Sequence, residues 1–359
     1  MNLAELTTLR VGGPAGRVVE ATTRDELVAA VAGLDEGDLV LGGGSNLVVA
    51  DAGIPGTVLR VATRGIAEPR PGILRIEAGE PWDDVVRAAI ARGWAGIEAL
   101  SGIPGSAGAA PIQNIGAYGQ EIAGCVVAVE VAEPGTGRVE RLEPAQLGFG
   151  YRTSVFKQGH PGVVVALELA LDTSDPGVSN PIAYAQLASA LQVRIGDRVP
   201  LDQVRTAVLD LRRSKGMVLD AADPDSVSAG SFFTNPIVTE SFARGLPADA
   251  PRWPQEPEEP ERVLPLGSAI PPPVPGGERH VKLSAAWLIE HAGIPRGFGL
   301  PGVRAGISSK HTLAIVNRGG ASAADVVQLA DYVQTRVLSE FGVLLRPEPT
   351  LVGFPPDQI

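Results

Sequence analysis

The sequence has one cysteine, few lysines and no long hydrophobic segment. With Cys125 as its only cysteine, the chain can form neither an intramolecular disulfide nor an all-cysteine metal site, which fits a reducing cytoplasm. The longest apolar runs, such as 163–167, have the length of a strand, well below the roughly 18 residues of a membrane span. The first residues, MNLAELTTLRVGG, lack the apolar stretch of a signal peptide. We therefore expect a cytoplasmic protein that does not bind membranes.

Basic residues are also outnumbered. Lysine and arginine total 30 against 41 acidic residues, and the formal net charge is −11. Proteins that bind nucleic acids or anionic membranes usually carry a basic surface. The charge balance therefore argues against both classes of partner.

Lysine is scarce even among the basic residues. Four of the 30 are lysine and the remaining 26 are arginine. One interpretation is an arginine-rich genome composition. The other is that the retained lysines stand where arginine cannot replace them. The four lysines are Lys157, Lys215, Lys282 and Lys310.

Glycine, in contrast, is abundant, with 44 of 359 residues against a usual share of roughly 7%. A hydrophobic share of 44% and a charged share of 20% indicate a folded chain, and the length suggests two or three domains. Helical and strand patterns are mixed throughout the chain without an internal repeat, and we expect an α+β fold. Helices are expected at 25–34, 82–94, 184–191, 201–215, 283–291 and 323–341, and strands at 38–41, 47–50, 57–61, 73–77, 126–131, 163–171, 313–316 and 351–354.

Residues 247–276 differ from the rest of the chain in composition. They contain ten prolines and the acidic run EPEEPE. This composition predicts an extended loop or insertion outside the folded core.

Two glycine-rich segments stand beside predicted strands. In the first, GGGSN at 42–46, the loop is followed by a strand, whereas a dinucleotide-binding Rossmann motif needs a following helix. The loop is either an anion-binding nest of backbone N–H groups or a plain tight turn. The second, SGIPGSAGAAPIQNIGAYGQEIAG at 101–124, carries apolar anchors that flexible linkers lack, which is typical of a loop that approaches a ligand closely.

Six segments in this order resemble the UDP-N-acetylenolpyruvoylglucosamine reductase family, within the vanillyl-alcohol-oxidase-like flavoproteins. They are TLRVGGPA at 8–15, LGGGSNLVVAD at 41–51, SGIPGSAGAAPIQNIGAYGQE at 101–121, GYRTSVFK at 150–157, AGSFFTNP at 229–236 and LLRPEPTLVGF at 344–354. The resemblance implies an α+β protein with an FAD-binding fold of two lobes and a C-terminal α+β substrate-binding domain. The expected boundaries are 1–63 for the first lobe, joined by a C-terminal strand at 351–359, 64–218 for the second, and 219–350 for the substrate domain with the insertion 247–276.

The resemblance also implies a reaction. NADPH would reduce a non-covalently bound FAD, which would then reduce UDP-N-acetylglucosamine enolpyruvate to UDP-N-acetylmuramate for peptidoglycan synthesis. Negative charge develops on the enolate and carboxylate, so the site needs a cationic stabiliser and a proton donor. The motif matches imply Arg152 as the stabiliser, Ser231 as the proton donor and Glu348 as a third catalytic group. On sequence alone, these three are equally a surface arginine, a loop or helix-capping serine and a solvated carboxylate.

The cofactor contacts implied by the resemblance come mainly from the two glycine-rich loops. They are Gly43, Gly44, Ser45, Asn46, Gly105, Ser106, Gly108, Ile112, Asn114, Gly116, Tyr118 and Arg212. None of the four histidines lies in these loops, so a histidyl-linked flavin is not expected. Since no histidine–carboxylate cluster has metal-ligand spacing, we also expect no catalytic metal.

Three residues match positions that hold the substrate in the family: Tyr184, Lys215 and Asn235. Tyr184 indicates the subtype with a substrate-covering tyrosine loop. Their alternative roles are an apolar helix anchor, a helix C-terminal charge and a turn residue before Pro236. We expect a monomer.

Two other functions stay open. A flavin oxidase acting on an alcohol would use O₂ and would not need Ser231. A catalytically inactive flavin- or UDP-sugar-binding regulator would keep the loops and lose one of Arg152, Ser231 or Glu348, whereas all three are present.

Overall fold

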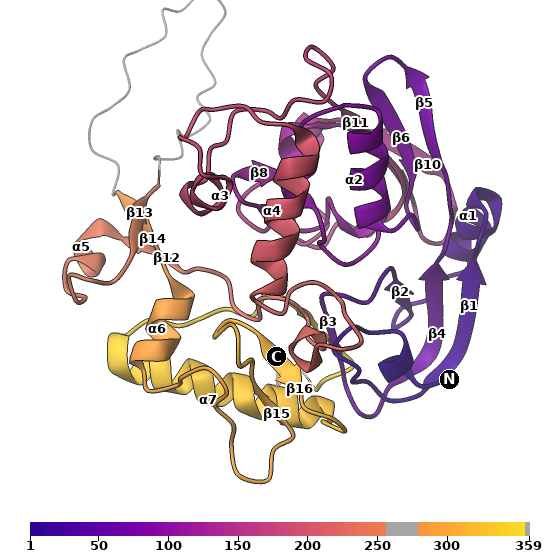
Figure 1. Ribbon diagram of the computed structural model, residues 1–359. Coiled ribbons are helices and arrows are strands. Elements are labelled where there is room, and N and C mark those ends of the chain that lie inside the picture. The colour runs from indigo at the N-terminus through magenta and orange to yellow at the C-terminus, as the bar shows by residue number, and fades with distance from the viewer. Residues whose placement is uncertain (256–278, 356–359) are drawn as a thin grey trace, which may run out of the picture.

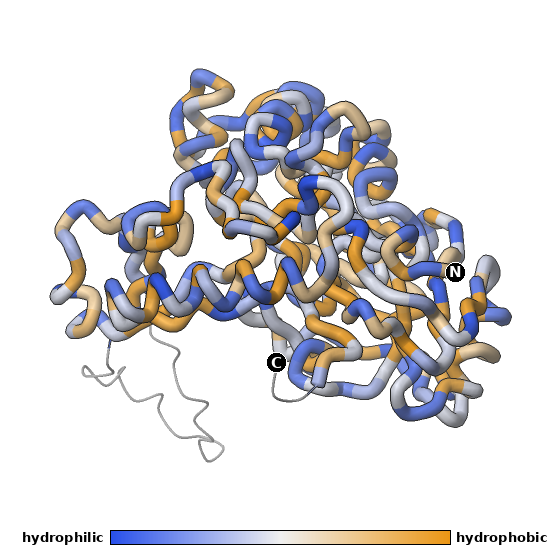
Figure 2. The backbone as a smooth tube through the Cα atoms, turned by 90° about the horizontal axis from the view of Figure 1, so that it is seen from below, coloured by the Kyte–Doolittle hydropathy of each residue, from blue (hydrophilic) through white to orange (hydrophobic). Residues whose placement is uncertain are grey.

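In the computed structural model, which describes residues 1–255 and 279–355, helices and strands are mixed along the chain and gather into three regions (Figure 1). This arrangement confirms the predicted α+β class. Hydrophilic residues gather at the outer turns, and hydrophobic stretches run through the interior (Figure 2).

The first region is a parallel three-stranded sheet in the order β1-β4-β2. Its strands are β1 (Ala15–Ala21), β4 (Ile54–Val61) and β2 (Leu39–Leu41). Helix α1 (Arg24–Ala32) follows β1 and begins with a capping box formed by Thr23 and Glu26. Next to this sheet, β3 (Leu47–Val49) pairs in parallel with β17 (Thr350–Val352), so the C-terminal part of the chain returns to the N-terminal region.

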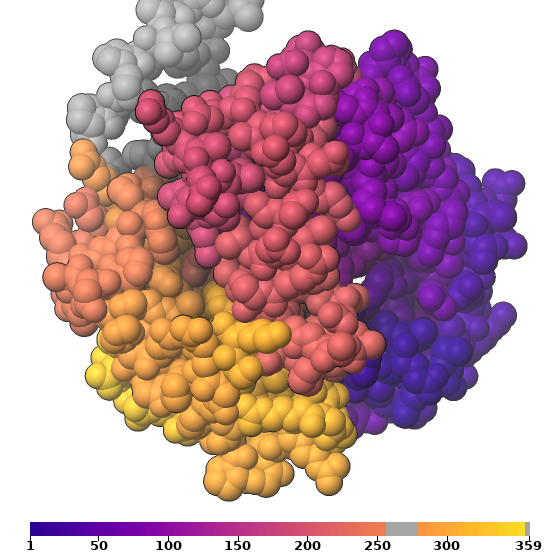
Figure 3. Space-filling view, in the orientation of Figure 1, coloured from indigo at the N-terminus to yellow at the C-terminus, as the bar shows by residue number. Residues whose placement is uncertain are grey.

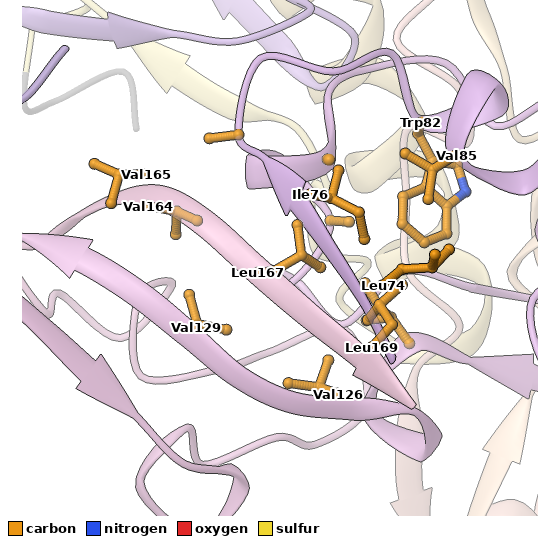
Figure 4. Packing of buried hydrophobic residues seen from close by; sticks show 14 of the residues in the cluster. Leu74, Ile76, Trp82, Val85, Val126, Val129, Val164, Val165, Leu167 and Leu169 are labelled. Atoms are coloured by element: carbon orange, nitrogen blue, oxygen red, sulfur yellow. The ribbon is translucent and has the colours of Figure 1, made fainter. Parts of the chain in front are cut away.

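The second region is an antiparallel five-stranded sheet in the order β10-β9-β11-β6-β5. Its strands are β10 (Val139–Leu142), β9 (Val126–Ala132), β11 (Val163–Ala170), β6 (Ile73–Glu77) and β5 (Ile66–Arg70). In β6, Leu74 and Ile76 are buried and alternate with partly exposed residues, as a sheet with one covered face requires. Both pack with Trp82 and Val85 of α2 (Trp82–Ala91) in one hydrophobic cluster (Figure 4).

Helix α1 joins the first two regions. Its buried Leu27 and Val31 belong to the same hydrophobic cluster as residues of β6, β9 and β11. Arg24 forms a partly buried ion pair with Glu130 of β9. One continuous core therefore extends across position 63, where the first predicted lobe boundary lies.

Helices α3 (Ala185–Leu191) and α4 (Leu201–Arg213) pack against each other through a separate small core that includes Leu187, Val204 and Val208. Helix α4 lies between the second region and the C-terminal region (Figure 1). In the space-filling view the surface is hollowed where the N-terminal regions meet the segment around α4 (Figure 3).

The third region contains the antiparallel sheet β12-β14-β13 and the hairpin β15-β16. Its elements are β12 (Ile237–Thr239), α5 (Glu240–Ala243), β13 (Arg252–Pro254), β14 (His280–Leu283), α6 (Ala285–His291), β15 (Ala305–Ile307), β16 (Ile315–Asn317) and α7 (Ala323–Phe341). Helix α7 supplies six buried residues to the core of this region, among them Val326, Leu329 and Val333.

The structure corrects several predicted element boundaries. The helix expected at 82–94 ends at Ala91, because Gly93 takes a φ of +75° that an α-helix cannot continue. Tyr184, expected inside a helix, precedes α3 with an extended backbone, and α4 ends before Lys215. Leu283, expected to begin a helix, ends strand β14. The elements that were not predicted are β1, β5, β10, β12, β13, β14, β15, helix α5 and the short strands β7 (Gly116–Ala117) and β8 (Gln120–Glu121).

The prediction that residues 247–276 lie outside the folded core is partly wrong. Within 247–255, Ala250 is buried and β13 pairs with β14, so this part belongs to the folded region. Residues 256–276 of the predicted insertion lie outside the described residues.

In the described ranges 1–255 and 279–355, no helix is both long and apolar enough to cross a membrane.

Polar contacts attach the third region to the first. The Asn317 side-chain amide donates to the carbonyl groups of Leu9 and Arg10, both at 3.1 Å. The Thr8 hydroxyl donates to the carbonyl of Ser228 at 2.7 Å. These contacts hold the C-terminal region against the N-terminal sheet.

Asp51 makes a further contact between the same two regions. Its carboxylate accepts hydrogen bonds from Ala323 N (2.8 Å) and Ala324 N (3.0 Å), the first two N–H groups of α7. We expect Asp51→Ala to lower the free energy of unfolding by about 1 kcal/mol, since the N–H groups lose an anionic acceptor at the helix N-terminus. Urea unfolding measures this, with Asp35→Ala in the loop before β2 as a surface control. A loss equal to that of the control would contradict this role.

Candidate active site

The two glycine-rich loops lie against each other. A Cβ atom added to Gly43 would lie 2.6 Å from the Cα atom of Gly105, and one added to Gly42 would lie 2.4 Å from Ser106 Oγ. The Ser45 hydroxyl donates to the carbonyl of Pro104 at 3.1 Å, which ties the loops together. Only residues without a side chain allow this approach of the two backbones.

Both loops line a cavity of about 250 Å³ that is open to solvent. The predicted cofactor-binding residues that line it are Gly43, Gly44, Ser45, Asn46, Gly105, Ser106, Ile112, Gly116 and Arg212. The three predicted catalytic residues, Arg152, Ser231 and Glu348, line the same cavity. The structure therefore brings together residues from five separate motifs.

Arg212 provides a buried cation at this cavity. It lies near the end of α4 and is 9% exposed. Burial lowers the pKa of its guanidinium group to about 10. Its Nη2 donates to the carbonyl of Met217 at 2.9 Å, but its buried Nε has no hydrogen-bond partner in the described part of the chain. An unpaired buried donor of this kind fits a polar or anionic ligand.

Three predicted cofactor-binding residues do not line the cavity. Gly108 packs on Ala78, where an added Cβ would approach within 2.6 Å of the Ala78 Cβ. The amide of Asn114 donates to the carbonyl of Gly150 at 3.0 Å, so Asn114 supports the turn that precedes Arg152. Tyr118 lies with the predicted substrate residues described below.

Arg152 is held from two sides. Its Nη2 donates to the carbonyl of Gly116 at 2.8 Å, and its Nε lies 3.5 Å from Glu348 Oε1. Its backbone φ of +55° falls in the left-handed region that residues with a side chain rarely adopt. Such a conformation at a cavity is typical of functional sites.

Ser231 is positioned by pairing between two loops. Glu348 N donates to the carbonyl of Phe232 at 2.9 Å, and Thr234 N donates to the carbonyl of Arg346 at 3.0 Å. Phe232 itself is fully buried. This pairing sets the AGSFF and RPEPT segments side by side, so Ser231 and Glu348 come to the same wall of the cavity.

Glu348 is a buried carboxyl group next to two cations. Burial raises its pKa, and the nearby charges of Arg152 and Lys157 counteract part of this rise. Lys157 Nζ donates to the main-chain carbonyl of Glu348 at 2.8 Å, and burial lowers the pKa of this lysine. A buried carboxyl group at a cavity wall with two cations beside it is a candidate for acid–base chemistry.

Two predicted substrate residues form a separate group with Tyr118. The rings of Tyr118 and Tyr184 meet edge to face at 5.8 Å, and Lys215 Nζ lies 5.5 Å from the centre of the Tyr118 ring. Lys215 also donates to Gln186 Oε1 at 3.0 Å. Tyr184 is 44% exposed, and neither it nor Lys215 lines the main cavity.

Asn235, the third predicted substrate residue, does not line the main cavity either. Its Oδ1 accepts a hydrogen bond from Ala285 N at 2.9 Å, at the start of α6. Tyr151 faces Asn235, and Lys282 Nζ lies 4.8 Å from the centre of the Tyr151 ring. Asn235 thus contacts the element that also carries Arg152.

Among the residues that were not predicted as site residues, two contact Glu348 through their side chains: Gln113 and Lys157. Gln113 Nε2 donates to Glu348 Oε1 at 3.2 Å, and Lys157 binds the main chain of Glu348. Both residues lie inside motifs that the sequence analysis identified, at 101–121 and 150–157. Their common partner lies about 200 residues away along the chain, which no sequence pattern reveals.

Comparison with known proteins agrees with this geometry. Residues 15–143 match the family model of an FAD binding domain, as predicted for the glycine-rich loops. Residues 223–352 match the model of the UDP-N-acetylenolpyruvoylglucosamine reductase, C-terminal domain.

Relatives of the full length carry the same name. The UDP-N-acetylenolpyruvoylglucosamine reductase of Leifsonia xyli subsp. xyli is 59% identical, with 98% of each chain covered. That of Thermobifida fusca is 49% identical over 98% of this chain and 96% of the relative. A solved structure, UDP-N-acetylenolpyruvylglucosamine reductase (MurB) from Thermus caldophilus, is 27% identical with a TM-score of 0.64, covering 98% of this chain and 97% of that one. On these grounds, the chain belongs to the UDP-N-acetylenolpyruvoylglucosamine reductase family.

Proposed function

We propose that this chain is an FAD-dependent oxidoreductase that uses NADPH to reduce UDP-N-acetylglucosamine enolpyruvate to UDP-N-acetylmuramate, a step of peptidoglycan precursor synthesis. The observation that carries the proposal is the convergence of Arg152, Ser231 and Glu348 on the cavity lined by both glycine-rich loops. The name shared by the full-length relatives supports the same substrate.

The residues of the cavity fit the cofactor. The backbones of the two loops form a cradle that a single added Cβ atom would fill, and Arg212 presents a buried N–H group without a partner in the described residues. Gly43, Gly44, Ser45 and Asn46 would bind it from one side, and Gly105, Ser106, Ile112 and Gly116 from the other. When bound, FAD would supply the hydride-transfer chemistry that links NADPH to the substrate.

Side chains of the protein stabilise the negative charge of the enolate and deliver the proton. The planar guanidinium of Arg152 binds the substrate carboxylate by two contacts and stabilises the negative charge that develops on the enolate. Ser231 donates the proton to the enolate carbon; because a serine hydroxyl is a weak acid, it depends on its position and on the neighbouring positive charge. Glu348 helps to polarise the enolpyruvyl group. The sugar and diphosphate are bound by Tyr184, Lys215 and Asn235. Tyr184 belongs to the tyrosine loop that covers the substrate in one subtype of the family.

The same proposal divides the chain by function. Residues 1–63, with 351–359, and residues 64–218 form the two FAD-binding lobes, and 219–350 form the substrate domain. The pairing of β17 with β3 supports the return of the C-terminal strand, of which 356–359 lie outside the described residues. We propose a monomer acting in the cytoplasm, where NADPH and nucleotide sugars are available.

Steady-state turnover tests this function against the oxidase alternative. NADPH consumption that depends on the enolpyruvyl sugar nucleotide, without oxygen uptake, is the expected result. Rapid oxygen uptake with an alcohol and no NADPH consumption with the sugar nucleotide would refute it.

A prediction follows for the contact between the two loops. In Gly43→Ala, the methyl group would overlap the backbone of Gly105 and push the loops apart. Overpacking of this kind costs about 1–3 kcal/mol, so we expect FAD affinity to fall roughly 5- to 150-fold, measured by titration of the apoprotein. Gly124→Ala is the control, since nothing lies within 4 Å of its added Cβ. Equal FAD affinity in both variants would contradict the cradle.

A further inference from the structure

Three side chains from three different loops form a row along the wall of the cavity. Asn46 Nδ2 donates to Gln113 Oε1 at 2.5 Å, and Gln113 Nε2 donates to Glu348 Oε1 at 3.2 Å. Asn46 belongs to the first glycine-rich loop, Gln113 to the second, and Glu348 to the RPEPT segment. All three residues line the cavity.

The direction of the hydrogen bonds in this row is determined by a main-chain atom. Asn46 Nδ2 also lies 3.3 Å from the main-chain carbonyl oxygen of Glu348. A carbonyl oxygen only accepts, so the Asn46 atom that faces it must be the amide nitrogen. The Gln113 atom that faces the same nitrogen must then be its oxygen, and the Gln113 NH₂ group must point to Glu348.

The two oxygens of the Glu348 carboxyl group are therefore unequal. Oε1 faces two donors, Gln113 Nε2 and, at 3.5 Å, Arg152 Nε. Oε2 has no hydrogen-bond partner within residues 1–255 and 279–355, although the side chain lines the cavity. An oxygen that already accepts a hydrogen bond and faces a guanidinium group is the less favourable place for a proton.

We propose that Gln113 is a positioning residue: held by Asn46, it keeps Glu348 Oε1 an acceptor and leaves Oε2 as the oxygen that carries the proton whenever the carboxyl group is protonated. The proton is thereby presented on the oxygen without another partner, in the cavity that also holds Ser231. The catalytic consequence rests on the proposed function, whereas the hydrogen-bond row does not.

The charged and titratable groups around Glu348 come from one segment. Arg152 and Lys157 favour its ionised form. Burial raises the pKa of Tyr151, and the charge of Glu348 adds a smaller contribution in the same direction. The charges of Arg152 and Lys157 act on the carboxyl group as a whole, without distinguishing its two oxygens. Gln113 is uncharged and acts on one oxygen, so its removal should change the pKa of Glu348 by the loss of one hydrogen bond to the carboxylate.

The test is the pKa of Glu348 in the FAD-loaded protein without substrate. It is measured by NMR titration of ¹³C-labelled glutamate carboxyl groups, with the Glu348 signal identified by its loss in Glu348→Gln. We expect Gln113→Leu to raise this pKa by about one unit, because the ionised form loses a donor. Gln113→Glu, which has the same shape, should raise it further, since a second carboxylate then faces Oε1.

Matched controls separate this role from a structural one. Gln120 is another glutamine of the second loop, and its Oε1 accepts from Ala99 N at 2.8 Å without contacting Glu348. Gln120→Leu and Gln120→Glu should leave the pKa of Glu348 unchanged. In steady-state turnover, the pH limb that Glu348 controls should move to higher pH by the same amount in the Gln113 variants as the NMR shift.

Two measured outcomes would overturn the proposal. If the pKa of Glu348 in Gln113→Glu equals that of the wild type, or if the Gln113 and Gln120 variants shift it equally, Gln113 does not position the carboxyl group. These outcomes are read without any turnover. They are therefore distinct from failure of the proposed reaction, which would show as an absence of NADPH oxidation in the unchanged protein.

Discussion

Ser231→Ala is expected to slow reduction of the enolpyruvyl substrate by roughly 10²–10⁴-fold while leaving reduction of the flavin by NADPH nearly unchanged. The reason is that only the second half-reaction needs a proton delivered to the enolate carbon. Ser231 lines the cavity beside Glu348, whereas nothing in the first half-reaction requires a proton donor at this wall. Stopped-flow absorbance of the flavin measures the two half-reactions separately.

Two further variants sharpen this result. Ser231→Cys keeps a side chain that can donate a proton and should retain part of the lost rate. Ser214→Ala removes a hydroxyl that donates to the carbonyl of Leu211 on α4, outside the cavity, and should leave both half-reactions intact. Equal losses in both half-reactions of Ser231→Ala would mean that Ser231 is not the proton donor.

Arg152→Lys should lower the rate of substrate reduction by roughly 10²–10³-fold, although the positive charge is kept. A lysine cannot reproduce the planar two-point contact with a carboxylate. It would also lose the hydrogen bond of Nη2 to Gly116 and the approach of Nε to Glu348, and so would no longer be held in place. Single-turnover oxidation of the reduced enzyme by substrate measures this loss.

The control for this variant is Arg336→Lys. Arg336 also donates to a main-chain carbonyl, that of Ala292, but it does not line the cavity. We expect this variant to keep the wild-type rate. A rate for Arg152→Lys within a few-fold of the control would show that charge alone, without the guanidinium geometry, serves the reaction.

The sequence patterns predicted those elements whose burial is strongly periodic. The strand at 73–77 and the helix at 323–341 have the predicted bounds, because each places apolar residues on one face at the spacing of its type. Strand β1 was missed since most of its residues are at least partly exposed, and it is held by parallel pairing to β4 instead of by an alternating pattern. Strand β14 is short, and its end at Leu283 runs directly into α6, so local pattern alone did not separate the two.

The site was predictable only through the resemblance of several motifs together. No spacing rule places Arg152, Ser231 and Glu348 on one cavity, because loop pairing and strand pairing between distant segments bring them there. The same holds for Gln113, which the sequence marks only as a polar residue after Ile112. The direction in which Asn46 and Gln113 donate their hydrogen bonds depends on contacts in three dimensions, which the sequence does not show.

Three of the four lysines illustrate the two interpretations of their scarcity. Lys157 binds the main chain of Glu348, and Lys282 faces the ring of Tyr151 beside the site. Lys310, in contrast, forms an ion pair with Asp223 at 2.8 Å, a contact that an arginine could also make. Retention for function is therefore a reasonable hypothesis for the first two, and genome composition is sufficient for Lys310.

The flavin absorbance spectrum of the purified protein under anaerobic conditions tests the central claim most directly. The account predicts a bound flavin that NADPH bleaches and that one equivalent of UDP-N-acetylglucosamine enolpyruvate restores to the oxidised spectrum. A protein without flavin, or a bleached flavin that only oxygen restores, would contradict it.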